Sequence, residues 1–263
     1  MPTALVFDSG VGGLSVFQEI RQMMPDLSVI YAFDNAGFPY GEKPEQLIAE
    51  RVVKMVGALC QRHHIDIIVI ACNTASVVSL PALRENFDIP VVGVVPAVKP
   101  AAGLTRNGIV GLLATKVTVN RPYTHELIAN FAQDCQIELM GSSRMVELAE
   151  EKLHGKPVSV DELRSILSPW INGDKKPDTI VLGCTHFPLL KDELSAVLPK
   201  GTLLVDSGAA IARRVSSLLA DADWQQEELP INLAYCSKVD DESRKLIPVL
   251  QHFGFKSLNE QPI

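Results

Sequence analysis

The stretch "IDIIVIACNTASVV", residues 65–78, decides how this chain folds. Its first half is an almost unbroken apolar run that ends at Ala71, and Cys72, Asn73 and Thr74 follow directly. A short apolar run is typical of a strand buried on both faces of a parallel sheet, and small polar residues are typical of a helix start. The stretch therefore predicts a strand that leads straight into a helix.

The same alternation runs along the whole chain. Apolar runs predict strands at Thr3–Phe7, Val29–Phe33, Ile65–Ala71, Pro90–Val95, Ile109–Ala114, Ile137–Met140, Thr179–Leu182, Leu203–Val205 and Asn232–Tyr235. Amphipathic runs predict helices at roughly 14–24, 44–62, 76–86, 120–133, 159–171, 188–198, 208–220 and 241–252. Buried strands that alternate with helices indicate an α/β protein with doubly wound, mostly parallel sheets.

Two segments have the composition of crossings between domains. They are "VVPAVKPAAG" (94–103), which holds two prolines, and "LPKGTLLVDSG" (198–208). We therefore expect one α/β domain from residues 1–96 with 208–263, and a second from residues 97–207. Open parallel sheets bind ligands beyond the carboxyl ends of their strands. If the two domains face each other, the active site lies in the cleft between them.

The composition excludes several kinds of partner. The 263 residues carry a net charge of −7, which argues against nucleic acid or an anionic membrane surface as a partner. No apolar run reaches the roughly 18 residues of a membrane helix, and the first residues do not resemble a signal peptide. We expect a cytoplasmic protein whose five cysteines are reduced thiols. Since no CxxC pair is present, we expect no metal site.

Two of the cysteines stand in matching settings. "TIVLGCTHFP" (179–188) repeats the outline of the first stretch, so Cys184 follows a buried strand as Cys72 does. A thiol at the N-terminus of a helix feels the positive end of the helix dipole, which favours the thiolate. One free cysteine is often just a small buried residue. Two cysteines at equivalent strand ends favour a chemical role instead.

Short polar side chains accompany both cysteines. Asn73, Thr74, Thr185 and Ser9 stand at expected helix starts, where free backbone N–H groups suit a carboxylate or a phosphate. Thr115 follows another strand and belongs to the same kind of position. Helix capping is the alternative explanation for all of them. Beside two cysteines, we expect them to bind substrate.

The segment "DSGVGGLSV" (8–16) combines an aspartate with a glycine-rich turn. The third glycine of a G-x-G-x-x-G dinucleotide loop would fall on Ser15, and a Walker A lysine is missing. The glycines therefore indicate a tight turn and a close backbone approach to a small ligand. Asp8 remains open as a general base, a helix cap or a metal ligand.

A few further residues are candidates for the site. "GFPYGEKP" (37–44) places Tyr40 and Gly41 on a loop that can close over a pocket. His186 lies two residues after Cys184, and Glu150 is a further titratable side chain. Structural roles stay open for each of these four residues.

In combination, the segments DSGVGGLSV, PYG, ACNTAS and GCTHFP resemble the glutamate racemases of the cofactor-independent aspartate/glutamate racemase family. The resemblance extends from about residue 3 to past Asp206. It implies two pseudo-symmetric α/β domains, usually in a homodimer, and no cofactor. It also implies an enzyme that interconverts L- and D-glutamate and supplies D-glutamate for peptidoglycan.

The resemblance assigns roles to residues as well. It implies that Cys184 abstracts the proton from L-glutamate and Cys72 the proton from D-glutamate. Glu150 matches an acidic position of the family, although "SSRMVELAEE" (142–151) departs from the commoner Cys-Pro-rich pattern. The residues implied to bind substrate or to assist the cysteines are Asp8, Ser9, Tyr40, Gly41, Asn73, Thr74, Thr185 and His186.

The chemistry of racemisation explains why two cysteines are needed. An α-hydrogen must leave one face of the substrate and another must return to the opposite face, which two fixed bases achieve without moving. Three alternatives remain. They are a related racemase acting on another acidic amino acid such as aspartate, a nicotinamide-dependent oxidoreductase, and a non-enzymatic ligand-binding module.

Overall fold

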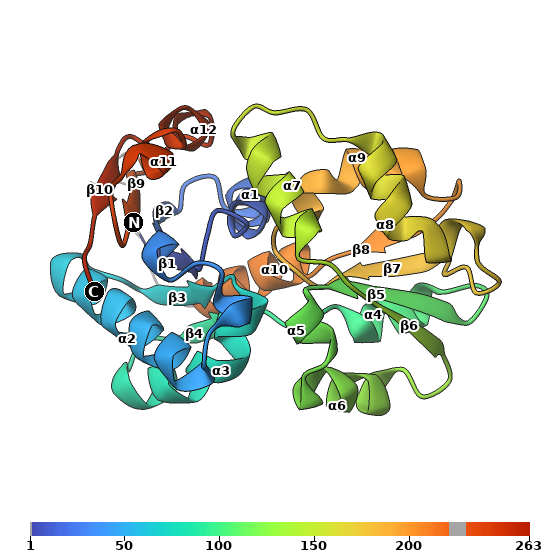
Figure 1. Ribbon diagram of the computed structural model, residues 1–263. Coiled ribbons are helices and arrows are strands. Elements are labelled where there is room, and N and C mark those ends of the chain that lie inside the picture. Colours follow the sequence, from blue (N-terminus) through green and yellow to red (C-terminus); the bar gives the residue numbers. More distant parts are fainter. Residues whose placement is uncertain (1, 221–229) are drawn as a thin grey trace. The chain divides into compact units, whose positions relative to one another are not determined.

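A computed structural model describes residues 2–220 and 230–263 (Figure 1). The chain forms two compact units. Unit 1 comprises Met1–Val94 and Gly208–Ile263, and unit 2 comprises Val95–Ser207. The sequence predicted boundaries after residues 96 and 207, so the first of these differs by two residues. Each unit is built on a parallel sheet of its own.

The sheet of unit 1 has the strand order β10-β9-β2-β1-β3-β4. Its strands are β1 (Thr3–Asp8), β2 (Ser28–Phe33), β3 (Ile67–Ile70), β4 (Val91–Gly93), β9 (Asn232–Cys236) and β10 (Leu258–Glu260). Its helices are α1 (Leu14–Met23), η1 (Asn35–Gly37), η2 (Tyr40–Glu42), α2 (Glu45–Arg62), α3 (Asn73–Asn86), α10 (Gly208–Leu219), α11 (Asp241–Arg244) and α12 (Ile247–His252).

Helices cover both faces of this sheet, which is why its central strands are apolar throughout. On one face, Leu5 and Phe7 of β1 pack in a core with residues of α2 and α3. On the other face, the ring of Tyr31 from β2 contacts Phe255, which in turn contacts Phe17 of α1. Every residue of β2 and β3 is buried. A strand enclosed on both faces has no polar side to expose, so it does not alternate.

The sheet of unit 2 has the strand order β6-β5-β7-β8. Its strands are β5 (Ile109–Ala114), β6 (Gln136–Gly141), β7 (Thr179–Leu182) and β8 (Leu203–Val205). Its helices are α4 (Val98–Leu104), α5 (Lys116–Val119), α6 (Pro122–Phe131), α7 (Arg144–Leu153), α8 (Val160–Asn172), η3 (Phe187–Leu190) and α9 (Lys191–Val197).

The two sheets repeat one topology, because β2-β1-β3-β4 in unit 1 corresponds to β6-β5-β7-β8 in unit 2. The central pairs also share a register, with Phe7 opposite Ile70 and Leu113 opposite Leu182. In each pair the chain leaves the two strands toward opposite edges of the sheet, and this switch point is where open α/β sheets bind ligands.

The predicted α/β class with two parallel sheets is confirmed, since every strand pair in the described residues is parallel. Several details were wrong. Residues 98–104, most of which were expected to belong to a crossing between domains, form helix α4. Pro100 is compatible with this helix because it lies in the first turn, where a missing N–H costs nothing. The sequence patterns also missed α5, α7 and the three-residue β10, and the helix expected at 241–252 is divided into α11 and α12.

Candidate active site

In unit 1, Cys72 stands at the switch point between β1 and β3. The backbone N–H of Ala71 donates to the carbonyl of Phe7 at 2.7 Å, which fixes the chain just before the cysteine. Cys72 is the N-cap of α3, and its Sγ accepts the N–H of Ala75 at 3.4 Å. The hydroxyl of Ser9 lies 3.6 Å from the same sulfur. Hydrogen bonds to the sulfur and the helix N-terminus both favour the thiolate of Cys72.

Asp8 is fully buried and organises the loop that carries Ser9. Its Oδ1 accepts the backbone N–H of Ser9 at 2.5 Å, the hydroxyl of Ser9 at 3.3 Å and the N–H of Gly10 at 3.4 Å. A side chain at Gly13 would meet the Asp8 carboxylate at 2.9 Å. The glycine-rich turn predicted a close backbone approach, and at Gly13 the group that comes close to the backbone is the side chain of Asp8. The hydroxyl of Ser9 connects this carboxylate with Cys72.

Asn73 and Thr74 are the first two residues of α3, which begins three residues earlier than the sequence predicted. Both are buried, with 8% of their surface exposed. The Oδ1 atom of Asn73 is buried and makes no hydrogen bond within the described chain. Most buried polar atoms in proteins are paired, so this unpaired oxygen at a helix start is a candidate contact for a ligand.

Tyr40 lies in the core of unit 1, and Gly41 follows it in η2. The Tyr40 hydroxyl donates to Asp34 at 2.6 Å, and Arg51 donates to both oxygens of Asp34 at 2.6 and 2.7 Å. Burial, with the nearby Asp34 and Cys72, raises the pKa of Tyr40 far above its usual value. Asp34 therefore holds the hydroxyl that we expected to meet a ligand.

Sequence analysis missed Asp34 and Arg51. Burial alone would raise the pKa of Asp34, but hydrogen bonds from Arg51, Ser237 and Tyr40 bring it below the usual value. A signal was present, because Asp34 follows the apolar run of β2 just as Asp8 ends that of β1. Arg51 lies within the long helix α2 and had no comparable signal.

In unit 2, Cys184 occupies the position in the sheet that Cys72 occupies in unit 1. The N–H of Gly183 donates to the carbonyl of Leu113 at 2.7 Å, the same contact that precedes Cys72. A side chain at Gly183 would come within 3.1 Å of that carbonyl, so the residue must be small. Cys184 is partly exposed. The matching outlines in the sequence thus reflect matching places in two sheets.

A histidine and a glutamate stand behind Cys184. The Sγ of Cys184 lies 3.8 Å from Nδ1 of His186. The Nε2 atom of His186 lies 2.6 Å from Oε1 of Glu150, which α7 supplies from 36 residues away in the sequence. Three of the predicted catalytic residues, Cys184, His186 and Glu150, are therefore in one chain of contacts.

The environment of His186 favours its charged form. Burial alone would lower the pKa of His186, but the contacts with Cys184 and Glu150 raise it well above the usual value. The charged ring lies 3.8 Å from the sulfur of Cys184. The expected helix N-terminus at Cys184 was wrong, because His186 precedes the short turn η3 and caps it. The charged imidazole ring of His186 therefore lies beside Cys184, where the N-terminus of a helix was expected.

Thr115 and Thr185 are the remaining predicted residues of unit 2. Thr115 caps α5, its Oγ1 accepting the N–H of Thr118 at 3.2 Å. Thr185 is buried directly beside Cys184 in the chain. The strand registers make Thr115 the counterpart of Ser9 and Ala114 the counterpart of Asp8. Unit 2 therefore has no carboxylate on its strand β5, and Glu150 reaches Cys184 through His186 instead.

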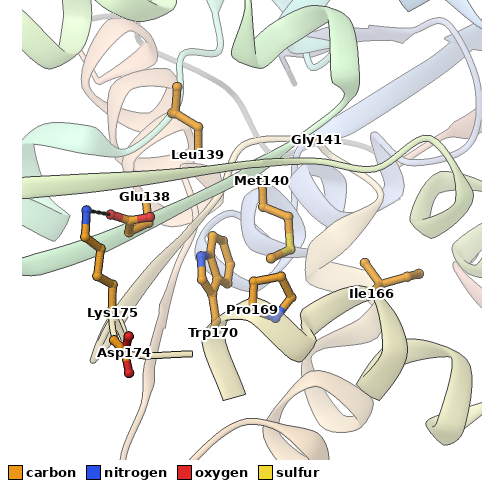
Figure 2. Close-up of a pocket in the computed structure, with 9 residues that line it drawn as sticks. All are labelled: Glu138, Leu139, Met140, Gly141, Ile166, Pro169, Trp170, Asp174 and Lys175. Carbon is orange, nitrogen blue, oxygen red and sulfur yellow. Dashed lines mark ion pairs between the residues drawn. The ribbon is translucent and has the colours of Figure 1, made fainter. Parts of the chain in front are cut away.

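A cavity of about 530 Å³ in unit 2 lies apart from these residues. It opens between β6 and the C-terminal part of α8, with Trp170 at its centre and the Glu138–Lys175 ion pair (3.3 Å) at one side (Figure 2). None of the predicted site residues lines it. The described residues contain no group of three or more His, Cys, Asp and Glu side chains able to hold a metal ion. Within the same ranges, every helix is too short or too polar to cross a membrane.

Comparisons with known proteins give one consistent answer. The model of a family described as Asp/Glu/Hydantoin racemase matches residues 12–215. A protein named glutamate racemase from Serratia proteamaculans is 63% identical over 262 residues, which is 100% of this chain and 91% of that relative.

Solved structures extend the comparison. The crystal structure of Escherichia coli glutamate racemase in complex with L-glutamate and activator UDP-MurNAc-ala matches with a TM-score of 0.96 and 62% identity, over 99% of this chain and 98% of that one. Glutamate racemase from Thermus thermophilus in complex with beta-chloro-D-alanine matches with a TM-score of 0.78 and 31% identity, over 100% and 97% of the two chains.

Proposed function

Because the chain belongs to the Asp/Glu/hydantoin racemase family, we propose that it interconverts L-glutamate and D-glutamate by proton transfer between Cα and two cysteine thiols. The enzyme class expected from the sequence, an amino-acid racemase, is confirmed. The observation that carries the mechanism is the placement of Cys72 and Cys184 at matching switch points of two sheets.

The proposed reaction needs one thiolate and one thiol. The thiolate of Cys184 takes the α-proton of L-glutamate, and the electron pair of the broken C–H bond remains on the substrate as an enolate-like carbanion. The thiol of Cys72 then delivers its proton to the opposite face, giving D-glutamate and leaving Cys72 as the thiolate. The reverse reaction exchanges these roles. Cysteine suits this chemistry because its pKa, about 8.5, lies near neutral pH.

The proposal requires both thiols to reach opposite faces of one substrate molecule. The contacts within each unit support a proton-transfer role for its cysteine. Cys72 has Ser9 and the N-terminus of α3, and Cys184 has His186 and Glu150. On this proposal the buried polar groups at Asn73, Thr74 and Thr185 bind the substrate carboxylates and stabilise the developing enolate.

Glutamate is favoured over aspartate as the substrate because relatives 63% identical over the full chain are named glutamate racemase. The proposal includes a supply of D-glutamate for peptidoglycan, a cytoplasmic location and a homodimer. Sedimentation of the pure protein tests the homodimer, which a single species of monomer mass would exclude. The mass of one chain is 28.7 kDa.

The decisive experiment offers D-glutamate, D-aspartate and D-alanine separately to the pure protein and follows optical rotation. We expect racemisation of glutamate only. In deuterated water, the product enantiomer should carry deuterium from its first appearance while the remaining starting enantiomer stays protiated. Early deuterium in the starting enantiomer would indicate a single mobile base and contradict the two-thiol mechanism.

Substitutions test the two bases directly. Cys72→Ala and Cys184→Ala should each abolish racemisation, because each removes the only proton donor or acceptor assigned to one face. Cys135→Ala is the matched control, since Cys135 is a partly buried thiol of unit 2 that packs against the core cluster containing Val110 and Val181. Full activity in either of the first two variants would refute the mechanism.

A further inference from the structure

We propose that Lys152 is a positioning residue for the Cys184 half of the site: it fixes helix α7 on the turn that carries His186, so that Glu150 stays in contact with the histidine ring. This inference rests on the proposed function only for its effect on catalysis. Its effect on the thiol of Cys184 does not depend on which substrate the enzyme uses.

Lys152 connects two segments that are far apart in the sequence. Its Nζ donates to the carbonyl oxygen of Leu189 at 2.8 Å, and it lies 2.8 and 2.9 Å from the two carboxylate oxygens of Glu193. Leu189 belongs to η3, and Glu193 lies in the first turn of α9. Only 35% of the Lys152 side chain and 21% of the Glu193 side chain are exposed. Partial burial reduces the screening of this pair by water and salt.

The turn after Cys184 transmits this attachment to His186. The carbonyl of Cys184 accepts the N–H of Phe187 at 3.0 Å, and the carbonyl of His186 accepts the N–H of Leu189 at 3.1 Å. Residues 184–189 therefore form one compact hydrogen-bonded unit. A contact that holds the Leu189 carbonyl also fixes the orientation of His186.

Helix α7 thus meets the turn at two polar points. Glu150 contacts the His186 ring at 2.6 Å, and Lys152, two residues further along α7, contacts Leu189 at 2.8 Å. A single contact would allow the helix to rotate about it, whereas two contacts fix its orientation. The other end of α7 is attached elsewhere, because Arg144 donates to both oxygens of Glu162 on α8 at 2.7 and 3.2 Å.

The consequence for Cys184 follows from the charge of His186. Two of the groups that face the His186 ring are the carboxylate of Glu150 from α7 and the sulfur of Cys184 from its own turn. Contact with Glu150 helps to raise the pKa of His186. Without that contact the ring holds its proton less tightly, and the thiolate of Cys184 loses a neighbouring positive charge. A positional error of about 1 Å in an active site can cost on the order of 10²-fold in rate.

The test uses Lys152→Met, which keeps the length of the side chain and removes its donors, and Lys152→Arg, which keeps a cation. Lys175→Met is the matched control, because Lys175 makes an ion pair of 3.3 Å with Glu138 in the same unit, at the cavity (Figure 2), and Cys184 does not line that cavity. Each variant is compared with the parent protein for its melting temperature, for thiol alkylation and for racemisation.

The primary measurement is the rate at which iodoacetamide alkylates Cys184, read by peptide mass with Cys72 as the internal reference. In Lys152→Met we expect the Cys184 rate at pH 7 to fall at least about 5-fold while Cys72 stays within about 2-fold, since only one thiolate loses its positive neighbour. We expect kcat to fall about 10-fold or more with KM nearly unchanged. Lys152→Arg should recover most of both losses, and Lys175→Met should show neither.

Three results would overturn the inference: an unchanged Cys184 alkylation rate in Lys152→Met, an equal loss in Lys175→Met, or no recovery in Lys152→Arg. If Lys152→Met does not fold, Glu193→Gln decides the question, because it removes the charge partner of Lys152 and must still lower the Cys184 rate. The alkylation measurement needs no turnover. Failure of the parent protein to racemise glutamate would therefore reject the proposed function and leave this inference to be decided separately.

Discussion

Replacing His186 by Asn is the sharpest test of how Cys184 is supported. The asparagine amide is shorter than the imidazole ring and cannot carry its positive charge. The variant therefore loses the contact with Glu150 at 2.6 Å and the charge beside Cys184. Burial of His186, which is 3% exposed, leaves little room for water to replace either interaction.

The magnitude follows from Coulomb's law. Two unit charges separated by the 3.8 Å between Cys184 Sγ and His186 Nδ1 attract by about 4 kcal/mol at an effective dielectric constant of about 20. Since Cys184 is partly exposed, water screens part of this attraction. Each 1.36 kcal/mol corresponds to a factor of ten in rate, so we expect kcat/KM to fall about 10²- to 10³-fold.

Thermodynamics restricts the form of the result. The two enantiomers have equal free energy in water, so their equilibrium constant is one and kcat/KM must fall equally in both directions. The individual kcat values are free to change unequally, because they depend on which protonation form of the enzyme accumulates. Initial rates from pure L- and pure D-glutamate, followed by circular dichroism, give all four constants.

His63→Asn is the matched control, because His63 also makes a ring hydrogen bond, at 2.9 Å to the hydroxyl of Tyr235 in unit 1. The kcat/KM of His63→Asn should remain within about 3-fold of the parent value. A loss below about 10-fold in His186→Asn would refute the electrostatic reasoning and leave His186 with a structural role.

The same histidine predicts a dependence of stability on pH. Its pKa in the folded protein is raised, with burial opposing and the contacts with Cys184 and Glu150 favouring the charged form. A raised pKa contributes stability that is fully present below the unfolded value, about 6.5, and is lost as pH rises through the folded pKa. Urea unfolding should therefore show the largest difference between the parent protein and His186→Asn below about pH 6.5. A difference that grows with rising pH would contradict this assignment.

Three further outcomes are expected. Asp8→Asn should lower kcat/KM equally in both directions, and it should skew the ratio of forward to reverse kcat in the sense opposite to His186→Asn, because the hydrogen bonds of Asp8 support the Cys72 half of the site. The same circular dichroism assay measures this ratio, and a skew of the same sense in both variants would contradict the assignment. Arg51→Met should destabilise the protein by about 3 kcal/mol in urea unfolding, because it leaves the buried carboxylate of Asp34 without its cation, and a change below about 1 kcal/mol would exclude that role. Gly13→Ala should lower the melting temperature and kcat together, because its methyl group would meet the Asp8 carboxylate at 2.9 Å, and unchanged values of both would show that the loop can move aside.

The sequence alone determined the class of fold and singled out the two cysteines that we propose as the bases. Strands buried on both faces of a parallel sheet must be apolar throughout, which is a local property of the sequence. Strands β1, β2, β5 and β7 could therefore be predicted from their apolar runs. The cysteines were found for a similar reason, because each follows the end of its strand after a single intervening residue in the chain. The end of a strand is a local property, and parallel sheets bring such ends to one edge.

Only the tertiary structure decided which groups support each thiol. Glu150 meets His186 across 36 residues, and Arg51 meets Asp34 across 17 residues, through the packing of helices on sheets. Sequence patterns follow the period of one helix or strand, so they report which face is buried and do not report which distant side chain lies against it. The physical reason is that hydrogen bonds and ion pairs act over a few ångströms in space, and the folded chain sets those distances.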